Sequence, residues 1–178
     1  MGSATDVANY LVQAPRPDAI RGVTLPRRTP YFPSPADWRD EVIYFLLPDR
    51  FSDGQEGTRP LVDRNHPQNN RPAGFRWDKW AEAGGGRYQG GTLNGVASKL
   101  AYLKGLGVTT LWVGPVLKQR THWDSYHGYA IQDFLEVDPR LGTRHDLVQL
   151  VASAKQQRIR ELLDIVFNHT GNNWIYGN

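Results

Sequence analysis

The sequence contains no cysteine, which excludes a disulfide framework and any metal centre built on thiolate ligands. It also lacks a long apolar run, since no stretch approaches the roughly 20 residues that span a membrane. The first residues show no basic segment followed by an apolar one, the pattern of a secretory leader. These absences predict a soluble cytoplasmic protein that is held together by packing, with no membrane partner, and leave a hard cation as the metal to consider.

A strong imbalance of charge is missing as well. The 21 Lys and Arg against 18 Asp and Glu give a formal net charge of +3, and the basic residues are scattered rather than gathered in one run. Nucleic acid is therefore not expected as a partner. With 178 residues, of which 39% are hydrophobic, the chain is long enough for one globular core of ordinary size.

Prolines crowd the first 37 residues, where no hydrophobic periodicity is sustained. The sequence therefore predicts a Pro-rich extended arm or linker over residues 1–37 and an ordered domain over residues 38–178.

Within this domain, apolar runs typical of strands alternate with segments of helical periodicity. The run over residues 42–47 suits a strand covered on both faces, as in a parallel sheet. This order predicts an α/β protein whose functional groups gather at the carboxyl ends of three parallel strands. The predicted strands are residues 42–47, 108–113 and 161–167; the predicted helices are residues 93–106 and a segment opened by Thr143; residues 48–91 and 116–134 are predicted as long loops.

The third predicted strand contains side chains that can do chemistry. Strand alternation places Leu162, Asp164 and Val166 on one face, and a buried Asp must be paired or hydrogen-bonded. Asp164 is therefore either a structural residue bonded to a neighbouring Arg or part of a site. Asn168 and His169 follow at the carboxyl end of the strand, where parallel α/β folds build their sites. The alternative is a turn Asn and a surface His.

The second predicted loop has Tyr126 and Tyr129 on either side of a His-Gly pair. Tyrosine rings offer a flat face with a polar tip, which suits stacking on a sugar ring, and Gly128 permits a turn or a close approach. The alternative is an aromatic surface cap. His122 and His127 lack a third ligand nearby, so a zinc site is not expected.

The first predicted loop opens with oxygen donors around a glycine: Asp49, Asp53, Gln55 and Glu56. Carboxylate and carbonyl oxygens are the ligands that Ca²⁺ prefers. The segment is therefore either a calcium-binding loop, with Asp53 as a candidate ligand, or a solvated acidic turn.

Taken together, four stretches resemble the N-terminal part of the catalytic domain of the alpha-amylase family, glycoside hydrolase family 13. The resemblance implies a partial TIM (β/α)8 barrel, of which this chain holds the first three parallel strands and two helices, truncated after strand 3. The stretches lie in the family's order over residues 38–173: EVIYFLLPDRFSDG, YQGGTLNGVASKLAYLKGLGVTTLWVGPV, SYHGYAIQDFLEVDPRLGT and LLDIVFNHTG.

The resemblance also implies a role in carbohydrate metabolism. The expected activity is that of an α-amylase-like glycosidase on α-glucosidic bonds of α-glucans or maltooligosaccharides, by a retaining mechanism with two carboxyl groups about 5–5.5 Å apart. In the family these carboxyl groups lie on strands 4 and 5, which this sequence does not reach. The chain is therefore expected to be a fragment that is inactive alone. The alternative is a non-catalytic truncated product or a carbohydrate-binding piece that needs a second chain.

Matching the family residue by residue assigns expected roles. His169 matches the residue that hydrogen-bonds a substrate hydroxyl in the transition state, and Asp164 matches the residue that braces an active-site Arg. Tyr129 matches the ring that stacks on the sugar at the cleavage subsite, with His127 as its hydrogen-bonding neighbour. Asn168 matches a common Ca²⁺ ligand.

Two positions depart from the family pattern. Glu161 stands in the third strand where an aliphatic residue is usual, and the loop around Asp53 lacks the fuller ligand set of calcium-binding members. Ca²⁺ is therefore expected in a full-length enzyme rather than in this chain. Both hydrolysis and transfer, and both α-1,4 and α-1,6 bonds, stay open, as does the oligomeric state.

Overall fold

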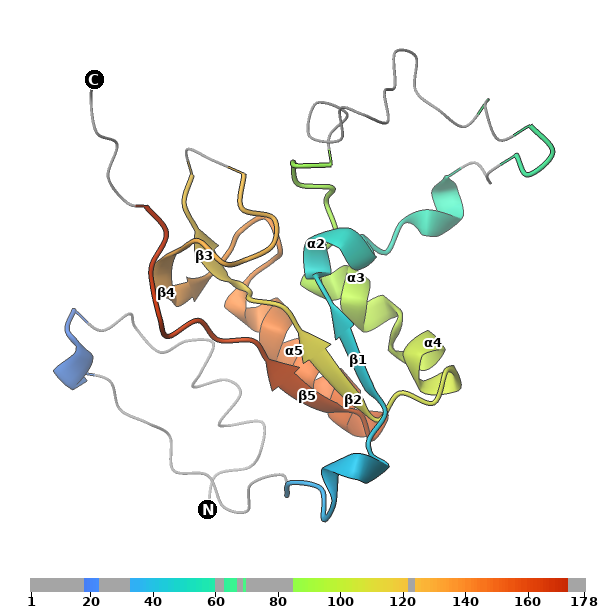
Figure 1. Ribbon diagram of the computed structural model, residues 1–178, viewed down its shortest axis with the longest axis horizontal. Coiled ribbons are helices and arrows are strands. Elements are labelled where there is room, and N and C mark those ends of the chain that lie inside the picture. Colours follow the sequence, from blue (N-terminus) through green and yellow to red (C-terminus); the bar gives the residue numbers. More distant parts are fainter. Residues whose placement is uncertain are drawn as a thin grey trace.

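A three-stranded parallel sheet in the order β1-β2-β5 is the centre of the fold (Figure 1). The structure is a computed structural model that describes residues 18–22, 33–59, 63–66, 69, 85–121 and 124–172. The predicted parallel α/β arrangement is confirmed. The strands are β1 (Ile43–Leu46), β2 (Thr110–Val113) and β5 (Arg160–Leu163).

The longer helices pack on one face of this sheet, and α5 (Arg144–Gln156) passes behind β2 and β5 in Figure 1. The helix predicted over residues 93–106 is divided into α3 (Leu93–Ser98) and α4 (Leu100–Gly105), because the backbone at Lys99 leaves the helical region at φ −104° and ψ 4°. Buried side chains from the helices and strands form one hydrophobic core. It includes Leu46, Leu93, Val96, Leu100, Leu103, Leu111, Val113, Leu150 and Ala154.

Helix α5 begins at the predicted residue and for a local reason. Thr143 and Asp146 form a reciprocal capping box, in which the Thr143 hydroxyl accepts from the Asp146 amide at 3.2 Å and the Asp146 carboxylate accepts from the Thr143 amide at 2.7 Å. The same carboxylate accepts from the Asn94 side chain at 2.9 Å. Asp146 thus caps α5 and also ties it to α3.

Helices α4 and α5 end in the same hydrogen-bonded motif. At the end of α5, the amide of Ile159 donates to the carbonyl of Ala154 at 2.9 Å, and the amide of Arg158 donates to the carbonyl of Lys155 at 3.0 Å. The motif needs a residue in the left-handed region. Gly107 fills this place after α4 with φ 87°, whereas Arg158 fills it after α5 with φ 58°.

The opposite face of the sheet is exposed within the described residues. Ile43, Phe45 and Trp112 are 47%, 46% and 42% exposed, and the rings of Phe45 and Trp112 meet edge to face at 5.3 Å. The expectation that the first strand is covered on both faces is therefore wrong for the described part of the chain, because the described helices α3, α4 and α5 pack on the other face.

A polar clamp joins the amino ends of the three strands. The Glu41 carboxylate accepts hydrogen bonds from the hydroxyls of Thr109 at 2.7 Å and Thr110 at 2.6 Å, and from the guanidinium of Arg160 at 2.6 Å. Thr109 and Thr110 lead into β2 and Arg160 begins β5, so one carboxylate before β1 fastens all three strands at this end.

The predicted loop over residues 116–134 contains strands that the sequence pattern did not reveal. β3 (Leu117–Gln119) pairs antiparallel with β4 (Ile131–Val137), with register shifts on both sides of Lys118. The irregular ladder hides the alternation of polar and apolar residues that marks a strand. Conversely, the third predicted strand ends at Leu163 rather than Phe167, so Asp164 lies one residue beyond β5.

The remaining described elements are short: η1 (Ile20–Gly22), η2 (Trp38–Asp40), α2 (Pro48–Phe51) and η3 (Glu56–Thr58). Most of the arm predicted over residues 1–37 lies outside the described residues, so that assignment stays a prediction. Among the helices that the structure describes, none combines the length and apolar character needed to cross a membrane.

Candidate functional site

The predicted site residues come together at the carboxyl ends of β2 and β5. The amide of Asp164 donates to the carbonyl of Val113 at 2.9 Å, which extends the ladder one residue past the strand ends. Beyond it, Gly171 donates to the carbonyl of Ile131 at 2.7 Å and ties the segment after β5 to the β3–β4 hairpin. The sheet and the hairpin thus present their loops to the same region.

Tyr129 and Asp164 are in direct contact. The Tyr129 hydroxyl donates to Oδ2 of Asp164 at 2.8 Å, while the residue as a whole stays 38% exposed. Burial, followed by the bond to Asp164 and its negative charge, raises the pKa of Tyr129. Tyr129 therefore has an anchored hydroxyl and a solvent-accessible ring. The Arg that Asp164 is expected to brace stays a prediction.

His169 is oriented by contacts on both of its ring nitrogens. Nε2 lies 3.0 Å from the carbonyl oxygen of Tyr129, and Nδ1 lies 3.2 Å from the Asn168 side-chain nitrogen. A carbonyl can only accept and an amide nitrogen can only donate, so this pattern assigns the proton to Nε2 and leaves Nδ1 as the acceptor. His169 therefore presents an N–H toward Tyr129.

His127 lies against the ring of Tyr129. The two rings are stacked at an angle of 17° with centroids 5.7 Å apart, and the Tyr129 amide donates to Nδ1 of His127 at 3.0 Å. Burial, and secondarily the positive charge of Arg120, lowers the pKa of His127. A neutral ring with Nδ1 as acceptor keeps its proton on Nε2, which is the donor required for a ligand hydroxyl.

The turn that places His127 and Tyr129 requires a glycine between them. Gly128 has φ +87°, and a Cβ atom there would lie 2.4 Å from the carbonyl oxygen of Pro115. The Gly128 amide also donates to the carbonyl of Ser125 at 2.9 Å. The close approach that the sequence suggested for Gly128 is therefore to this chain's own backbone.

Arg50 is a residue of this region that the sequence analysis missed. Its guanidinium lies 3.6 Å from the centroid of the Tyr126 ring and donates to the carbonyls of Gly85 at 2.7 Å and Arg87 at 2.9 Å. Arg50 thereby connects the segment after β1 with the aromatic loop. Its position in α2, directly after β1, is the signal that could have identified it.

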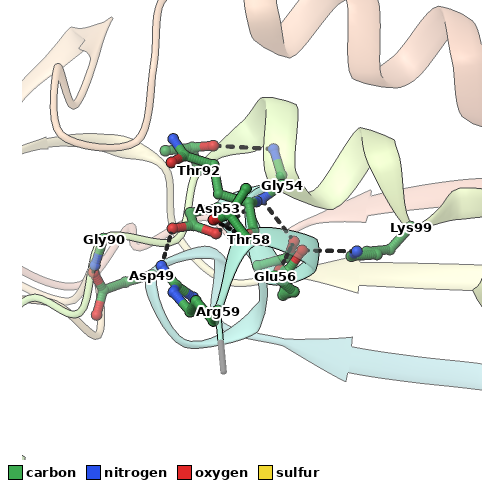
Figure 2. Close-up of polar contacts among 12 residues, drawn as sticks. Asp49, Asp53, Gly54, Glu56, Thr58, Arg59, Gly90, Thr92 and Lys99 are labelled. Atoms are coloured by element: carbon green, nitrogen blue, oxygen red, sulfur yellow. Dashed lines mark hydrogen bonds and ion pairs between the residues drawn. The ribbon is translucent and has the colours of Figure 1, made fainter. Parts of the chain in front are cut away.

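The acidic loop after β1 is held by contacts within the chain (Figure 2). Asp53 accepts from the Gln55 amide at 2.9 Å and forms an ion pair with Arg59. Glu56 accepts from the Ser52 hydroxyl and forms an ion pair with Lys99 at 2.8 Å. The pKa of Glu56 is lowered to about 2, first by the bond to Lys99 and then by the bond to Ser52.

Asp49 is engaged in the same way. It is 2% exposed, accepts from the backbone amides of Gln89 at 2.9 and 3.0 Å and of Gly90 at 3.0 Å, and pairs with Arg50 at 3.0 Å. The loop carboxylates thus already accept hydrogen bonds or pair with cations within this chain, and the role of Asp53 as a Ca²⁺ ligand stays a prediction.

Elsewhere, the described residues contain no group of three or more His, Asp or Glu side chains placed to hold a metal ion. The role of Asn168 as a Ca²⁺ ligand stays a prediction. His122, the partner considered for His127, lies outside the described residues.

The chain is similar to known enzymes of one family. Residues 45–177 match the model of the alpha-amylase catalytic domain. The periplasmic alpha-amylase of Escherichia coli K12 is 38% identical over 149 residues, covering 78% of this chain and 20% of that protein. Neopullulanase 2 of Thermoactinomyces vulgaris is 34% identical over 144 residues, covering 81% of this chain and 22% of that protein.

Solved structures agree with the sequence relatives. The alpha-amylase of Geobacillus thermoleovorans complexed with acarbose superimposes with a TM-score of 0.56 at 36% identity, covering 76% of this chain and 25% of that one. An Anoxybacillus alpha-amylase gives a TM-score of 0.58 at 35% identity, with coverages of 77% and 26%. The chain therefore spans about a fifth to a quarter of these proteins. The parallel α/β fold is part of their TIM barrel, and the chain belongs to the alpha-amylase family.

Proposed function

We propose that this chain forms the N-terminal part of the catalytic barrel of a glycoside hydrolase that acts on α-glucosidic bonds of α-glucans or maltooligosaccharides. The supporting observation is the contact cluster of Tyr129, His127, His169 and Asp164 at the carboxyl end of the sheet. This is the end where parallel barrels build their active sites.

Each member of the cluster has a chemical role in this proposal. The exposed part of the Tyr129 ring stacks on a glucose unit. His127 donates from Nε2 to a sugar hydroxyl. In this structure His169 Nε2–H donates to the Tyr129 carbonyl; when sugar binds, the same N–H donates to a substrate hydroxyl instead, and this hydrogen bond contributes most in the transition state. Oδ2 of Asp164 keeps its hydrogen bond from the Tyr129 hydroxyl, and Oδ1 accepts a hydrogen bond from an Arg on a later strand of the barrel.

Cleavage by the retaining mechanism needs a nucleophilic carboxylate and a carboxylic acid/base about 5–5.5 Å apart. Asp49 and Asp164, acids that follow β1 and β5, already accept hydrogen bonds from this chain. From the membership of the family we assign the nucleophile and the acid/base to later strands of the barrel, and substrate positioning to the contact cluster of Tyr129, His127, His169 and Asp164.

Binding of maltoheptaose to the 178-residue chain, followed by titration calorimetry, tests the proposal against a β-linked control, cellohexaose. We expect binding of the α-linked sugar only, weakened by tenfold or more in Tyr129→Ala. Tyr102→Ala removes a 59% exposed tyrosine on α4 and should leave the affinity unchanged. Equal binding of both sugars, or equal effects of the two substitutions, would contradict the proposed function.

A further inference from the structure

A buried side-chain amide holds the peptide groups on both sides of Tyr129. Gln119, the last residue of β3, is 2% exposed. Its Oε1 accepts from the amide of Ala130 at 2.7 Å, and its Nε2 donates to the carbonyl of Gly128 at 2.9 Å. These are the backbone groups immediately before and after Tyr129.

The irregular pairing of β3 with β4 explains why a side chain is needed there. The register shifts between Leu117 and Lys118 and again between Lys118 and Gln119, so the backbone ladder is interrupted beside the turn. The Gln119 side chain bonds the backbone of Gly128 and Ala130 beside this irregularity. Its Nε2 also donates to the carbonyl of Leu117 at 2.7 Å, so the side chain is hydrogen-bonded to its own strand β3 as well.

The orientation of this amide is unique. Exchanging its oxygen and nitrogen would place Oε1 against the carbonyls of Gly128 and Leu117, and Nε2 against the N–H of Ala130. Every hydrogen bond would become a repulsion between like groups. A buried amide fixed in this way transmits a displacement of its own backbone directly to the turn around Tyr129.

Gln119 is itself anchored by a buried ion pair. Its backbone amide donates to Oδ2 of Asp138 at 2.9 Å, and Asp138 is fully buried and bonded to Arg140 at 2.7 and 2.8 Å. Burial alone would raise the pKa of Asp138, but the bonds from Arg140 and the two amides outweigh it and hold the pKa below its ordinary value. The guanidinium of Arg140 in turn lies 4.1 Å from the centroid of the Tyr88 ring.

We propose that Gln119 is a positioning residue for carbohydrate binding, which fixes Tyr129 so that its hydroxyl meets Asp164 and its ring meets the sugar. Gln119 touches neither the sugar nor Asp164 and acts only through Tyr129. This inference rests on the function proposed above, but its geometry is testable without any sugar.

The test compares Gln119→Met, which keeps the length of the side chain and removes its hydrogen bonds, with Gln132→Met, the same change at an exposed position of β4. The first measurement is the titration of Tyr129, followed by NMR of protein labelled with ¹³C at the tyrosine ζ carbon and assigned with Tyr129→Phe. In Gln119→Met the pKa of Tyr129 should fall part of the way toward the ordinary tyrosine value: burial is the largest cause of the raised pKa, and the bond to Asp164, the second cause, is lost. In Gln132→Met it should stay raised.

The second measurement is maltoheptaose affinity, which should fall at least fivefold in Gln119→Met and stay within twofold in Gln132→Met. A folded Gln119→Met protein with the wild-type Tyr129 titration would overturn the inference, whatever its affinity. If the wild type binds no maltoheptaose, the proposed function fails, while the titration still decides the role of Gln119. Should Gln119→Met not fold, Gln119→Asn, which keeps the amide but shortens its reach, is expected to shift the Tyr129 titration in the same direction, and an unchanged titration would again contradict the inference.

Discussion

Tyr129 and Asp164, 35 residues apart in the sequence, are joined by a 2.8 Å hydrogen bond that connects the loop of the β3–β4 hairpin to the end of β5. The hydroxyl of Tyr129 thus has a structural task in addition to the stacking expected of its ring. The two tasks are separable, because one belongs to the polar tip and the other to the face of the same side chain.

Tyr129→Phe is expected to lower the free energy of unfolding by about 0.5–1 kcal/mol, because Asp164 loses a donor at a partly solvated site. Sugar binding should weaken less than in Tyr129→Ala, because the ring remains. The raised pKa of Tyr129 means that this stabilisation is present below about pH 10 and is lost as the pH rises through the folded-state value. Urea unfolding of both proteins between pH 7 and pH 11 checks this, and a constant difference across that range would contradict it.

Glu161 makes stability depend on pH near neutrality. Both carboxylate oxygens are buried, and no group among the described residues hydrogen-bonds to them, so burial raises the pKa of Glu161 to about 7. Glu161 then holds its proton more tightly in the folded protein than in the unfolded chain. The free energy of unfolding should therefore fall as the pH rises from about 4.5 to about 7, by an amount on the order of 1–3 kcal/mol. Glu161→Leu should remove this loss and be more stable than wild type at pH 8.

Glu161→Gln is the matched control for that prediction, since it removes the ionisation but keeps a buried polar group. It should flatten the same stretch of the pH profile without the full gain of Glu161→Leu. Thermal unfolding at pH 5 and pH 8 measures both effects. A wild-type pH profile that persists in the Gln variant would show that another group is responsible.

Helices α4 and α5 end in the same motif but have different residues at its left-handed position, Gly107 and Arg158, so the effect of each residue type can be tested at both ends. Arg158→Gly should stabilise the protein by up to about 1 kcal/mol, because a left-handed backbone strains a residue with a Cβ atom. Gly107→Arg should destabilise by a similar amount, because Gly107 has φ +87° and no atom near its missing Cβ, so only backbone strain changes. Urea midpoints that move in the same direction for both variants would refute this reasoning.

The loop after β1 should be insensitive to calcium. Millimolar Ca²⁺ and EDTA should give the same Tm for the wild type, because Asp53 and Glu56 are already paired with Arg59 and Lys99. Replacing both cations, in Arg59→Gln with Lys99→Gln, should free the carboxylates and make Tm rise with Ca²⁺. A calcium-dependent Tm in wild type that Asp53→Asn abolishes would show that the loop binds the metal after all.

The purified 178-residue chain is expected to bind maltooligosaccharides without cleaving them. The proposed function assigns the nucleophile and the acid/base to later strands of the barrel, so the residues of this site position a sugar without supplying the carboxylate pair that cleavage needs. A chromogenic maltooligosaccharide assay should stay at the blank. Turnover that copurifies with the intact chain would require a carboxylate pair within these residues.

The parts of the fold that depend on local chemistry were predictable from the sequence. Thr143 and Asp146 carry the capping box within four residues, and the strands of the sheet show as apolar runs. The break at Lys99 was not predictable, because the periodicity of the apolar residues continues across it.

The candidate site was predicted as a set of residues but not as an arrangement. Family resemblance identified Tyr129, His169 and Asp164, whereas the bonds among them depend on the β3–β4 hairpin. That hairpin is obscured by polar residues such as Gln119 and by a shifted register. Contacts between segments far apart in the chain leave no trace in local periodicity.

The clamp of Glu41 with Thr109, Thr110 and Arg160 lies at the opposite end of the strands from the candidate site. The hydrogen bonds of Glu41 thus hold one end of the sheet, while the other end carries the loops of the candidate site. Such a division lets substitutions accumulate in the loops without loosening the strands that carry them. Under the proposed function, a change of sugar specificity requires substitutions only in the loops, while the clamped end keeps the strand geometry unchanged.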